Sequence, residues 1–537
     1  MASTAPSPAG LAPFDRESRS FQQRWWILGV LCLSLLVIIV DNSILNVAIP
    51  TLVKDLGATN SQLQWMVDSY TLVFAGLLLT AGSLGDRFGR LGALQLGMAI
   101  FGLGSLASAL INTPGQLIGT RALMGIGGAL IMPATLSIIT NVFPPEERGK
   151  AIGMWAAIAG VATALGPISG GFLIEHFYWG SIFLVNLPIV AFALVAGRVL
   201  IPTSKDPSKP ALDPVGALLS IVGLVALVYG IIQAPENGWT SGATLTAFAV
   251  GVAVLVAFGV WESRTPSPML DTSFFSNPRF TAASAGIMLL FFAMFGSIFL
   301  QTQYLQFVMQ YTALQAGVRL LPMAIVMLIV APNSPRLAER WGTKAVVGLG
   351  LSIVALAMVL MAGLPAEHIS YWGDVAWRLM VMALGMGLTM GPATESIMGS
   401  LPRSKAGVGS AMNDTTRQVG GALGVAIIGS VMSSSFGNRV DEAFHRAAVP
   451  EAARHIARDG LGQAIEVAHH HPNPAVAQQL ITAAKDTFVL GLHRGVLVGA
   501  GAALIGAVVA FWALPARELV EPAAESAGDP TEPALVD

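Results

Sequence analysis

Four acidic residues of this 537-residue chain lie inside apolar stretches, at Asp41, Asp68, Glu395 and Asp414. An ionisable side chain in hydrocarbon is costly, so it must face a partner or a water-filled cavity, and it is a functional candidate by default. A carboxylate in such a cavity can carry a proton or hold a cation, and the two uses compete. These residue types therefore suit the exchange of a proton against a cation.

The positions of these acids within their apolar runs differ. Counting from Trp25 at ~1.5 Å per residue places Asp41 about 24 Å into its run, past the bilayer midplane, whereas Asp68 lies nearer one end of its run. Glu395, in MGPATESIMGSLP, lies late in the twelfth apolar run, near its cytoplasmic end. The alternative for Asp41 is a carboxylate that only packs, hydrogen-bonded to Asn42, Ser43 or another helix.

Two arginines accompany the acids. Arg121 lies in the run LIGTRALMGIGGA and must find a counter-charge or water, or else extend to the membrane interface. Arg417 follows Asp414 by three residues, a spacing that lets the two pair on one helix face. An internal ion pair without a transport role is the alternative for these last two.

The composition requires a membrane to position these residues. The chain is 54% hydrophobic and only 11% charged, with a mean hydropathy of +0.67, against roughly 25% charged residues in soluble domains. The net charge of -2 argues against nucleic acid as a partner, and the single Cys32 excludes an intrachain disulfide. Taking about 20 apolar residues per span, fourteen spans are expected near 25–50, 62–84, 92–112, 116–143, 150–174, 180–201, 214–233, 243–262, 280–306, 315–335, 345–364, 372–400, 406–434 and 489–514.

The basic residues predict that both termini are cytoplasmic. With the N-terminus inside, 18 of the 29 basic residues fall on the cytoplasmic side, as the positive-inside rule requires. The rule discounts long loops, here 435–488. We expect the first run, which exceeds a signal-peptide core in length, to be a retained helix.

The chain repeats itself internally. GSLGDRFGRLGAL at 82–94 and PRLAERWGTKAVV at 335–347 align at an offset of 253 residues, Asp86 with Glu339 and Gly89 with Gly342. Both copies follow a span. Two six-helix halves with two inserted spans explain the offset, and parallel repeats suggest a transporter that moves one half against the other.

The first copy resembles the loop motif of the major facilitator superfamily through Gly82, Asp86, Arg87, Gly89 and Arg90. In that loop, glycines permit tight turns, and the acid and arginines can form charge-assisted bonds in one conformation and break them in another. The alternative is that these charged residues only fix the orientation of the spans in the membrane. The run around Arg121 is similar to the family's arginine-bearing fourth helix, which implies a part in proton coupling.

The fifth run, GMWAAIAGVATALGPISGG, resembles the helix that marks drug:proton antiporters, through Gly166, Pro167, Gly170 and Gly171. Small residues let helices approach closely, and the Gly-Pro step permits a bend. The stretches DNSILNVAIP and QWMVDSYTL are similar to the first two helices of the fourteen-helix antiporters. In the ninth run, Gln301, Tyr304 and Phe307 form a polar-aromatic stripe that could line the cavity, where aromatic faces attract cations, or face the outer interface.

The resemblance implies an all-α polytopic membrane protein with the major-facilitator fold, two six-helix bundles plus two inserted helices. The expected organisation is a cytoplasmic tail at 1–23, a bundle at 24–201, a linker with the inserted spans at 202–278, a second bundle at 279–514 with a long extracytoplasmic loop at 435–488, and a cytoplasmic tail at 515–537.

Other functions find no support in the chain. It has no nucleotide-binding GxxxxGK[ST] loop and no GxSxG or HExxH motif, so neither an ATP-driven pump nor a membrane-embedded enzyme is expected. Three consecutive histidines, His469 to His471, are poorly spaced for one metal site. We expect no metal and no cofactor, and the proton gradient supplies the energy for transport.

The sequence therefore predicts a proton-coupled multidrug efflux antiporter of the bacterial inner membrane, exporting lipophilic cations such as quaternary ammoniums and dyes. Asp41 and Asp68 are the expected proton and cation sites, with Asp414 and Glu395 as further carboxylates. Arg121 and Arg417 are expected to couple proton binding to transport. Asp86, Arg87 and Arg90 are expected to gate the conformational change. The alternative is a facilitator of the same fold that exports a metabolite, lipid or antibiotic.

Overall fold

The computed structural model describes residues 18–207 and 211–515, and every regular element within them is a helix. Fourteen helical segments of this part are long and apolar enough to cross a membrane, which confirms the expected number of spans. The predicted tail 1–23, except for residues 18–23, and the predicted tail 515–537, except for residue 515, lie outside the described residues.

Many of the helices begin where the sequence supplies a capping side chain. The Thr59 hydroxyl accepts a hydrogen bond from the backbone N–H of Gln62, whose side chain accepts one from the Thr59 backbone, so the two form a capping box. Thr113 and Asp213 cap helices that start with proline. These caps satisfy backbone groups that the first helical turn leaves free.

The first bundle contains one short helix and six spans. Within it α3 packs on α5, α4 on α5, and α2 on both α6 and α8. Its elements are α1 (Arg19–Gln22), α2 (Arg24–Leu56), α3 (Asn60–Phe88), α4 (Arg90–Leu110), α5 (Pro114–Val142), α6 (Pro145–His176), α7 (Ser181–Leu184) and α8 (Asn186–Leu200), the last two sharing one span.

The second bundle repeats this plan with more interrupted helices. Here α11 packs on α17 and α20, and α15 packs on α16 and α20. Its elements are η1 (Thr272–Ser276), α11 (Pro278–Gln303), η2 (Tyr304–Val308), α12 (Ala313–Arg319), α13 (Leu321–Val330), α14 (Ser334–Trp341), α15 (Thr343–Met361), η3 (Tyr371–Ala376), α16 (Trp377–Gly399), η4 (Arg403–Lys405), α17 (Ala406–Arg446), α18 (Glu451–Arg458), α19 (Leu461–His469) and α20 (Pro474–Ala513).

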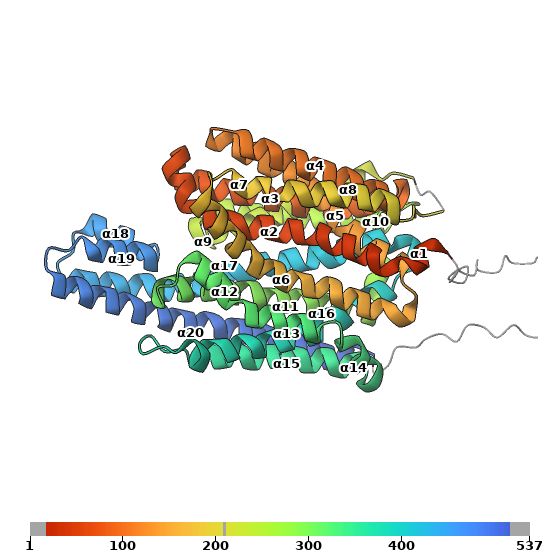
Figure 1. The fold of residues 1–537 in the computed structure, drawn as a ribbon. Coiled ribbons are helices and arrows are strands. Elements are labelled where there is room, and N and C mark those ends of the chain that lie inside the picture. Colours follow the sequence, from red (N-terminus) through yellow and green to blue (C-terminus); the bar gives the residue numbers. More distant parts are fainter. Residues whose placement is uncertain (1–17, 208–210, 516–537) are drawn as a thin grey trace, which may run out of the picture.

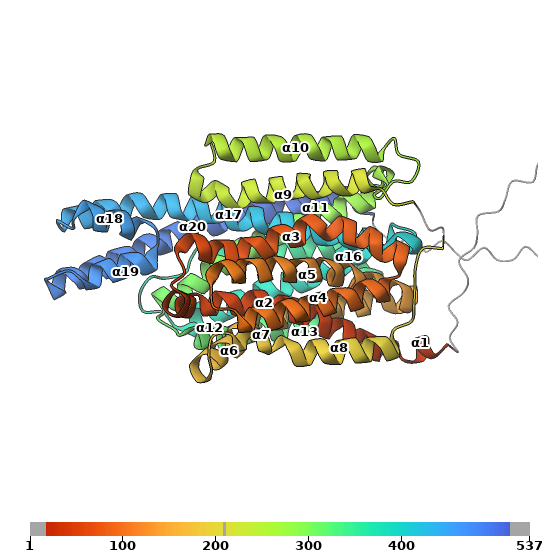
Figure 2. The ribbon, with the colours of Figure 1, turned by 90° about the horizontal axis from the view of Figure 1, so that it is seen from above.

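The two inserted spans, α9 (Pro214–Asn237) and α10 (Gly242–Glu262), lie on the outside of the bundle (Figure 2). α9 packs against α3 of the first half and α17 of the second, and α10 packs mainly on α9. The insertion therefore adds a peripheral layer at a junction of the two halves.

The two ends of the bundle differ. α18 and α19 project at one end, called the α18 end below, and α1 and α14 lie at the other, called the α14 end (Figure 1). The segment 435–488, predicted as a long loop, is mostly helical: α17 continues to Arg446, α20 begins at Pro474, and α18 and α19 lie between them. The prediction from hydropathy missed these extensions, because polar residues continue both helices beyond the apolar runs 406–434 and 489–514.

The internal repeat is visible in the backbone. Gly89 has a φ of 119° and separates α3 from α4, and Gly342 has a φ of 85° and separates α14 from α15. Positive φ is strained for residues with a Cβ, so the two aligned positions require glycine for the same reason. The repeat predicted from the sequence is thus confirmed at the level of local geometry.

The two halves meet along two seams. α17 packs against α3 and α5, and α6 packs against α12, α13 and α16. Small residues make the contacts close: Gly82 lies against Gly407 of α17, and Gly171 of α6 lies against Leu314 of α12. Such contacts let helices approach without large side chains between them.

Close packing of α11 on α17 predicts an asymmetric effect of two glycine substitutions. A Cβ at Gly424 would collide with the Phe292 backbone, whereas a Cβ at Gly501 meets nothing within 4 Å. We expect G424A to lower the melting temperature, since overpacking costs about 1–3 kcal/mol, while G501A leaves it equal or higher because alanine favours helix by about 1 kcal/mol. Thermal unfolding of both purified variants, followed by intrinsic fluorescence, checks this. Equal melting temperatures would contradict the close contact.

Candidate functional site

A cavity of ≈ 430 Å³ lies between the two halves. Both bundles contribute to it, through α2, α3, α5 and α6 of the first and α11, α13, α16 and α17 of the second. Its lining residues are Leu35, Ile38, Ile39, Asn42, Ser43, Val67, Tyr70, Thr71, Phe74, Met132, Ala159, Gly160, Thr163, Phe291, Met294, Phe295, Ile298, Met323, Met327, Met386, Met390, Asp414, Arg417 and Gln418. Its volume suits a drug-sized molecule.

The cavity wall is dominated by aromatic rings and methionines. Six methionines line it, together with Tyr70 and three phenylalanines. Methionine side chains are flexible and polarizable, and surfaces rich in them can adapt to differently shaped ligands. Asp414 and Arg417 are the only acid and base in the wall. The cavity is therefore an adaptable apolar site with one charged pair.

Asp41 lies behind this wall, not in it. Its side chain is 1% exposed, and its two oxygens face two partners: Oδ2 pairs with Arg121 Nη1, and Oδ1 accepts a hydrogen bond of 2.9 Å from Asn186 Nδ2. The expectation that this carboxylate faces the cavity directly is therefore wrong for this conformation. In the low-dielectric interior a buried carboxylate without a partner would be far more costly than one paired with an arginine.

Arg121 is fully buried between α2, α3 and α5, so it does not extend to the membrane interface. Besides Asp41 it donates to Asn42 Oδ1 at 3.1 Å and to the Met66 backbone oxygen at 3.2 Å, and its Cζ lies 4.4 Å from the centre of the Tyr70 ring. Asn42 and Tyr70 line the cavity. These two residues connect the buried ion pair to the cavity.

Asp414 and Arg417 form the pair that the i, i+3 spacing predicts, with Asp414 Oδ1 at 3.6 Å from Arg417 Nη1. The Arg417 guanidinium lies between two rings, with Cζ 4.9 Å from the centre of Trp155 and 4.7 Å from that of Phe291. Trp155 belongs to α6 and Phe291 to α11, so this arginine contacts both halves.

The other two predicted carboxylates lie outside the cavity lining. Asp68 is 7% exposed on α3, and its Oδ2 has no hydrogen-bond partner among the described residues. Glu236 of α9 is close enough to act on it electrostatically. Glu395 of α16 lies against Gly149 of α6, at the α14 end of the interface between the halves.

Asp86 joins the two halves at the α14 end. Its carboxylate accepts hydrogen bonds from Arg90 Nε at 2.9 Å, from Gly407 N at 2.9 Å and from Val408 N at 3.0 Å. The last two donors belong to the first turn of α17, where backbone N–H groups have no acceptor within the helix. The helix dipole also favours a negative charge at this position. Arg90 also donates to the Arg403 carbonyl at 2.8 Å. The predicted gating contacts of Asp86 and Arg90 thus cross the interface in this conformation.

The other residues of the motif surround this contact. Arg87 is partly exposed and lies over the ring of the adjacent Phe88. Gly82 packs on Gly407, and Gly89 provides the turn described above. The connection after α8 joins the same network, because the Asp206 N–H donates to the Asp86 backbone oxygen at 2.6 Å.

The antiporter-like helix α6 lies between the halves, as its glycines suggested. Gly166 and Gly170 face α2 at Ser43 and Ile44, and Gly171 faces α12. Pro167 is accommodated inside the helix and contacts Gly317 of α12. One face of α6 thus packs within its own bundle and another against the second bundle.

The polar-aromatic stripe of α11 does not line the cavity, which corrects the first of its two interpretations. Gln301 donates to Ser297 Oγ at 2.9 Å, and the Tyr304 hydroxyl donates to the Pro365 backbone oxygen at 2.7 Å. Phe307 packs against Gly462 of α19. The stripe spans the end of α11 and the π-helical residues Tyr304–Val308, and its contacts are with other residues of the second bundle.

Sequence reasoning missed Asn186, Trp155 and the methionine lining. Asn186 is fully buried and also donates to Ser105 Oγ at 3.0 Å; an amide inside the apolar run 180–201 was a signal that could have identified it. Among the described residues, no group of three or more His, Cys, Asp or Glu could hold a metal.

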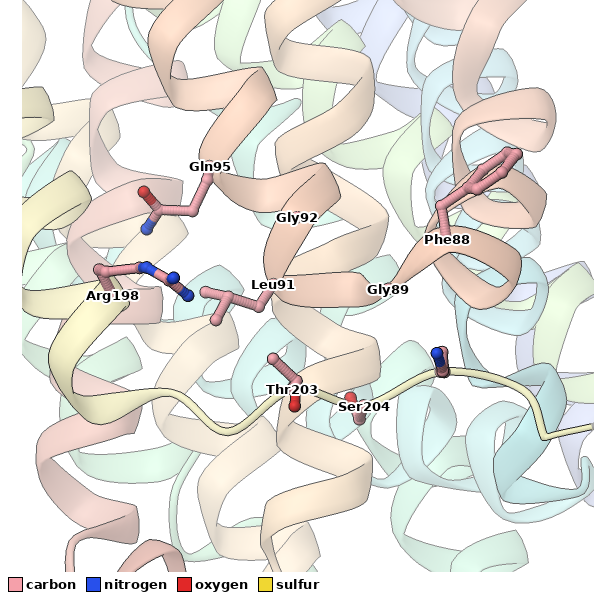
Figure 3. A pocket seen from close by; sticks show the side chains of 9 residues that line it. Phe88, Gly89, Leu91, Gly92, Gln95, Arg198, Thr203 and Ser204 are labelled. Atoms are coloured by element: carbon pink, nitrogen blue, oxygen red, sulfur yellow. The ribbon is translucent and has the colours of Figure 1, made fainter.

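A second hollow of ≈ 560 Å³ lies at the α14 end, beside the motif loop. Figure 3 shows Gln95 and Arg198 on one side of it and Thr203 and Ser204 on the connecting segment. Its charged residues, Arg198 and Lys205, are both basic. It lacks a carboxylate and lies away from the central cavity, so the central cavity is the candidate site.

Comparison with known proteins agrees with this architecture. The sequence model of the Major Facilitator Superfamily matches residues 31–425. The chain is 35% identical to the "Multidrug efflux pump LfrA" of Mycolicibacterium smegmatis over 92% of this chain and 97% of that one. It is 33% identical to the "Methyl viologen resistance protein SmvA" of Salmonella typhimurium, over 91% and 98%. It is 31% identical to the "Tetracenomycin C resistance and export protein" of Streptomyces glaucescens, over 91% of both.

Solved structures share the fold at lower identity. The human organic anion transporter MFSD10 superimposes with a TM-score of 0.59 at 13% identity, over 90% of this chain and 98% of that one. The proton:xylose symporter XylE does so with a TM-score of 0.57 at 15% identity, over 92% and 96%.

The buried Asp41–Arg121 pair predicts a non-additive effect on stability. Removing one partner leaves the other charge unpaired, which costs about 3–5 kcal/mol, whereas removing both is much less costly. We expect R121M alone to lower the melting temperature more than the double variant D41N/R121M does. Thermal unfolding of the wild type, both single variants and the double variant gives the coupling. Additive shifts would mean that the pair is not formed in solution.

The Asp86 contacts predict that D86N loosens the α14 end. A neutral amide there interacts more weakly with the α17 N–H groups and with Arg90. In a C32S background we expect a cysteine at the buried Ser410 of α17 to react several-fold faster with a maleimide when D86N is present. The matched control is R340Q, at an exposed position of the second motif copy. Unchanged reactivity would show that Asp86 does not hold the halves together.

Proposed function

The chain belongs to the major facilitator superfamily, whose members carry small molecules across membranes, and on that premise we propose that it is a proton-coupled exporter of lipophilic, mainly cationic drugs. Relatives named as a multidrug efflux pump and a methyl viologen resistance protein support export as the direction. The adaptable apolar cavity between the halves supports a range of lipophilic substrates.

The proton acts, in this proposal, at Asp41. A proton on this carboxylate cancels its charge and weakens its bond to Arg121, which must then find another partner in a low-dielectric interior. Arg121 also donates a hydrogen bond to Asn42 and packs over the Tyr70 ring. Any movement of the guanidinium is therefore transmitted to two cavity-lining residues.

The observation that carries the proposal is this contact between the ion pair and the cavity wall. Proton and substrate need not compete for one oxygen, as the sequence suggested, because Asn42 and Tyr70 connect the two sites. A substrate that displaces them favours one state of the Asp41–Arg121 pair, and protonation favours the other. Such reciprocal coupling is what exchange requires.

The remaining predicted residues take supporting roles in the proposal. Asp414 faces the substrate within the cavity, and Asp68 is a further proton site on α3. Glu395 and Asp86 lie at contacts between the halves at the α14 end, so they gate it together with Arg90. α6 slides on its glycine faces during the change.

We place the protein in the bacterial cytoplasmic membrane with both termini in the cytoplasm. The α14 end then faces the cytoplasm, in agreement with the distribution of basic residues. In the proposal, the Asp86 contacts hold this end closed, and their release opens the cavity to the cytoplasm. Substrate leaves and protons enter at the outer side, and the protons leave when the cytoplasmic side opens.

A second candidate function is export of an endogenous antibiotic or other metabolite. The tetracenomycin C resistance and export protein, at 31% identity over 91% of both chains, favours it. Substrate-induced proton release from purified protein, tested with cations, neutral drugs and lipids, distinguishes the two. Release by organic cations favours the drug exporter; release only by neutral metabolites favours the alternative.

The proposal predicts that D41N abolishes proton-driven ethidium efflux. Asparagine keeps the shape of the side chain and one of its two acceptor oxygens, so it keeps the bond from Arg121 or the one from Asn186, but it cannot take up a proton. Everted or reconstituted vesicles with an imposed pH gradient measure the efflux, and fluorescence size-exclusion checks folding and insertion. The control is E442Q, an exposed acid near the end of α17, which should transport as the wild type does. Unchanged efflux by a folded D41N protein would overturn the assignment.

A further inference from the structure

The charges around the central cavity are balanced. Arg417 accompanies Asp414 in the wall, and Arg121 accompanies Asp41 behind it. Together the two pairs have no net formal charge. A cavity selective for cations alone would carry unpaired carboxylates, as the four acids in the sequence suggested. The observed wall instead offers a negative and a positive group to the same ligand.

One edge of the Arg417 guanidinium makes no hydrogen bond within the described residues. Arg417 Nη1 lies toward Asp414, while Nε and Nη2 are buried and have no hydrogen-bond partner among the described residues. Nε and Nη2 are the two donors of one side of the guanidinium, the side that binds both oxygens of a carboxylate at once. Buried donors without partners are costly, so a ligand oxygen at this edge would be strongly favoured.

The orientation of this edge is held by the surrounding rings. The rings of Trp155 and Phe291 cover the guanidinium at 4.9 and 4.7 Å, and Trp155 is itself anchored by a hydrogen bond of 3.1 Å from Nε1 to Thr135 Oγ1. These contacts restrict the positions that the guanidinium can take. Preorganisation of this kind lowers the entropic cost of binding.

The Asp414 carboxylate likewise has one oxygen that accepts no hydrogen bond within the described residues. Asp414 Oδ1 faces Asn413 Nδ2 at 3.3 Å and Arg417, while Oδ2 is buried without a hydrogen-bond partner among the described residues. Asp414 and Arg417 are 2% and 6% exposed, and both line the cavity. An unpaired acceptor thus lies beside an unpaired pair of donors.

From this we infer that the cavity binds amphoteric aromatic compounds, with a carboxylate or equivalent oxygen on Arg417 and a cationic centre at Asp414. The inference rests on the proposed function and names its substrate class. Methionines and aromatic rings bind the apolar body, and the Asp414–Arg417 pair orients the two polar groups. Arg417 is thus a substrate-binding residue and not only the counter-charge of Asp414.

Two dyes with the same ring system test the inference. Rhodamine B carries a free carboxylate on a cationic xanthene, and its ethyl ester is the cation without the carboxylate. Fluorescence anisotropy with purified protein in nanodiscs measures the affinity for each dye. Proteoliposomes with an imposed pH gradient measure the transport of each.

We expect R417Q to weaken rhodamine B binding by about tenfold or more, the usual value of a charge-assisted bond, and to leave the ester bound as tightly or more tightly. D414N should weaken ester binding. The control R446Q removes an arginine from the exposed end of the same helix and should change neither affinity. If R417Q fails to fold with Asp414 unpaired, the neutral double variant D414N/R417Q is compared with D414N. Relative to D414N it should weaken rhodamine B binding by about tenfold or more and leave ester binding unchanged.

The outcomes separate this inference from the proposed function. Transport of the ester but not of rhodamine B by the wild type would overturn the inference and leave the exporter intact. An equal effect on both dyes of R417Q, or of R417Q added to D414N, would also overturn it, because Arg417 would then act only as a structural partner. Transport of neither dye would overturn both.

Discussion

A charge inside an apolar bundle needs an opposite charge beside it, and the Asp41–Arg121 pair is where this constraint organises the protein. The pair joins α2 to α5, and Asn186 adds α8 through its hydrogen bond to Asp41. Removing either charge would leave the other in a low dielectric at high cost. A proton is the smallest agent that can alter this balance, which is the reason that the proposed function assigns the proton to this pair.

The cavity depends on the same pair without containing it. Asn42 and Tyr70 contact Arg121 on one side and the cavity on the other. Substrate binding and proton binding can then influence each other without sharing an atom. Under the proposed function this arrangement would accommodate varied substrates, because a methionine-rich wall can adapt its shape while the Asp41–Arg121 pair keeps its own geometry.

The interface between the halves shows how the repeat has diverged. Gly89 and Gly342 keep the same backbone role, but the acids beside them do not. Asp86 is buried and binds the start of α17, whereas Glu339 is exposed on α14. At the start of α6 the acid comes from α16 instead, where Glu395 lies against Gly149. The two seams therefore differ in chemistry although the glycine turns beside them correspond.

Hydropathy determined the fourteen spans, and periodic motifs determined the repeat and the family, because both depend on residue type along the chain. The i, i+3 spacing also predicted the Asp414–Arg417 pair. The sequence could not show that Asp41 pairs with Arg121, 80 residues away, or that Gln301 and Tyr304 turn from the cavity. Partners distant in sequence are selected by helix packing, and only the tertiary structure decides which face of each helix meets the cavity and which meets another helix.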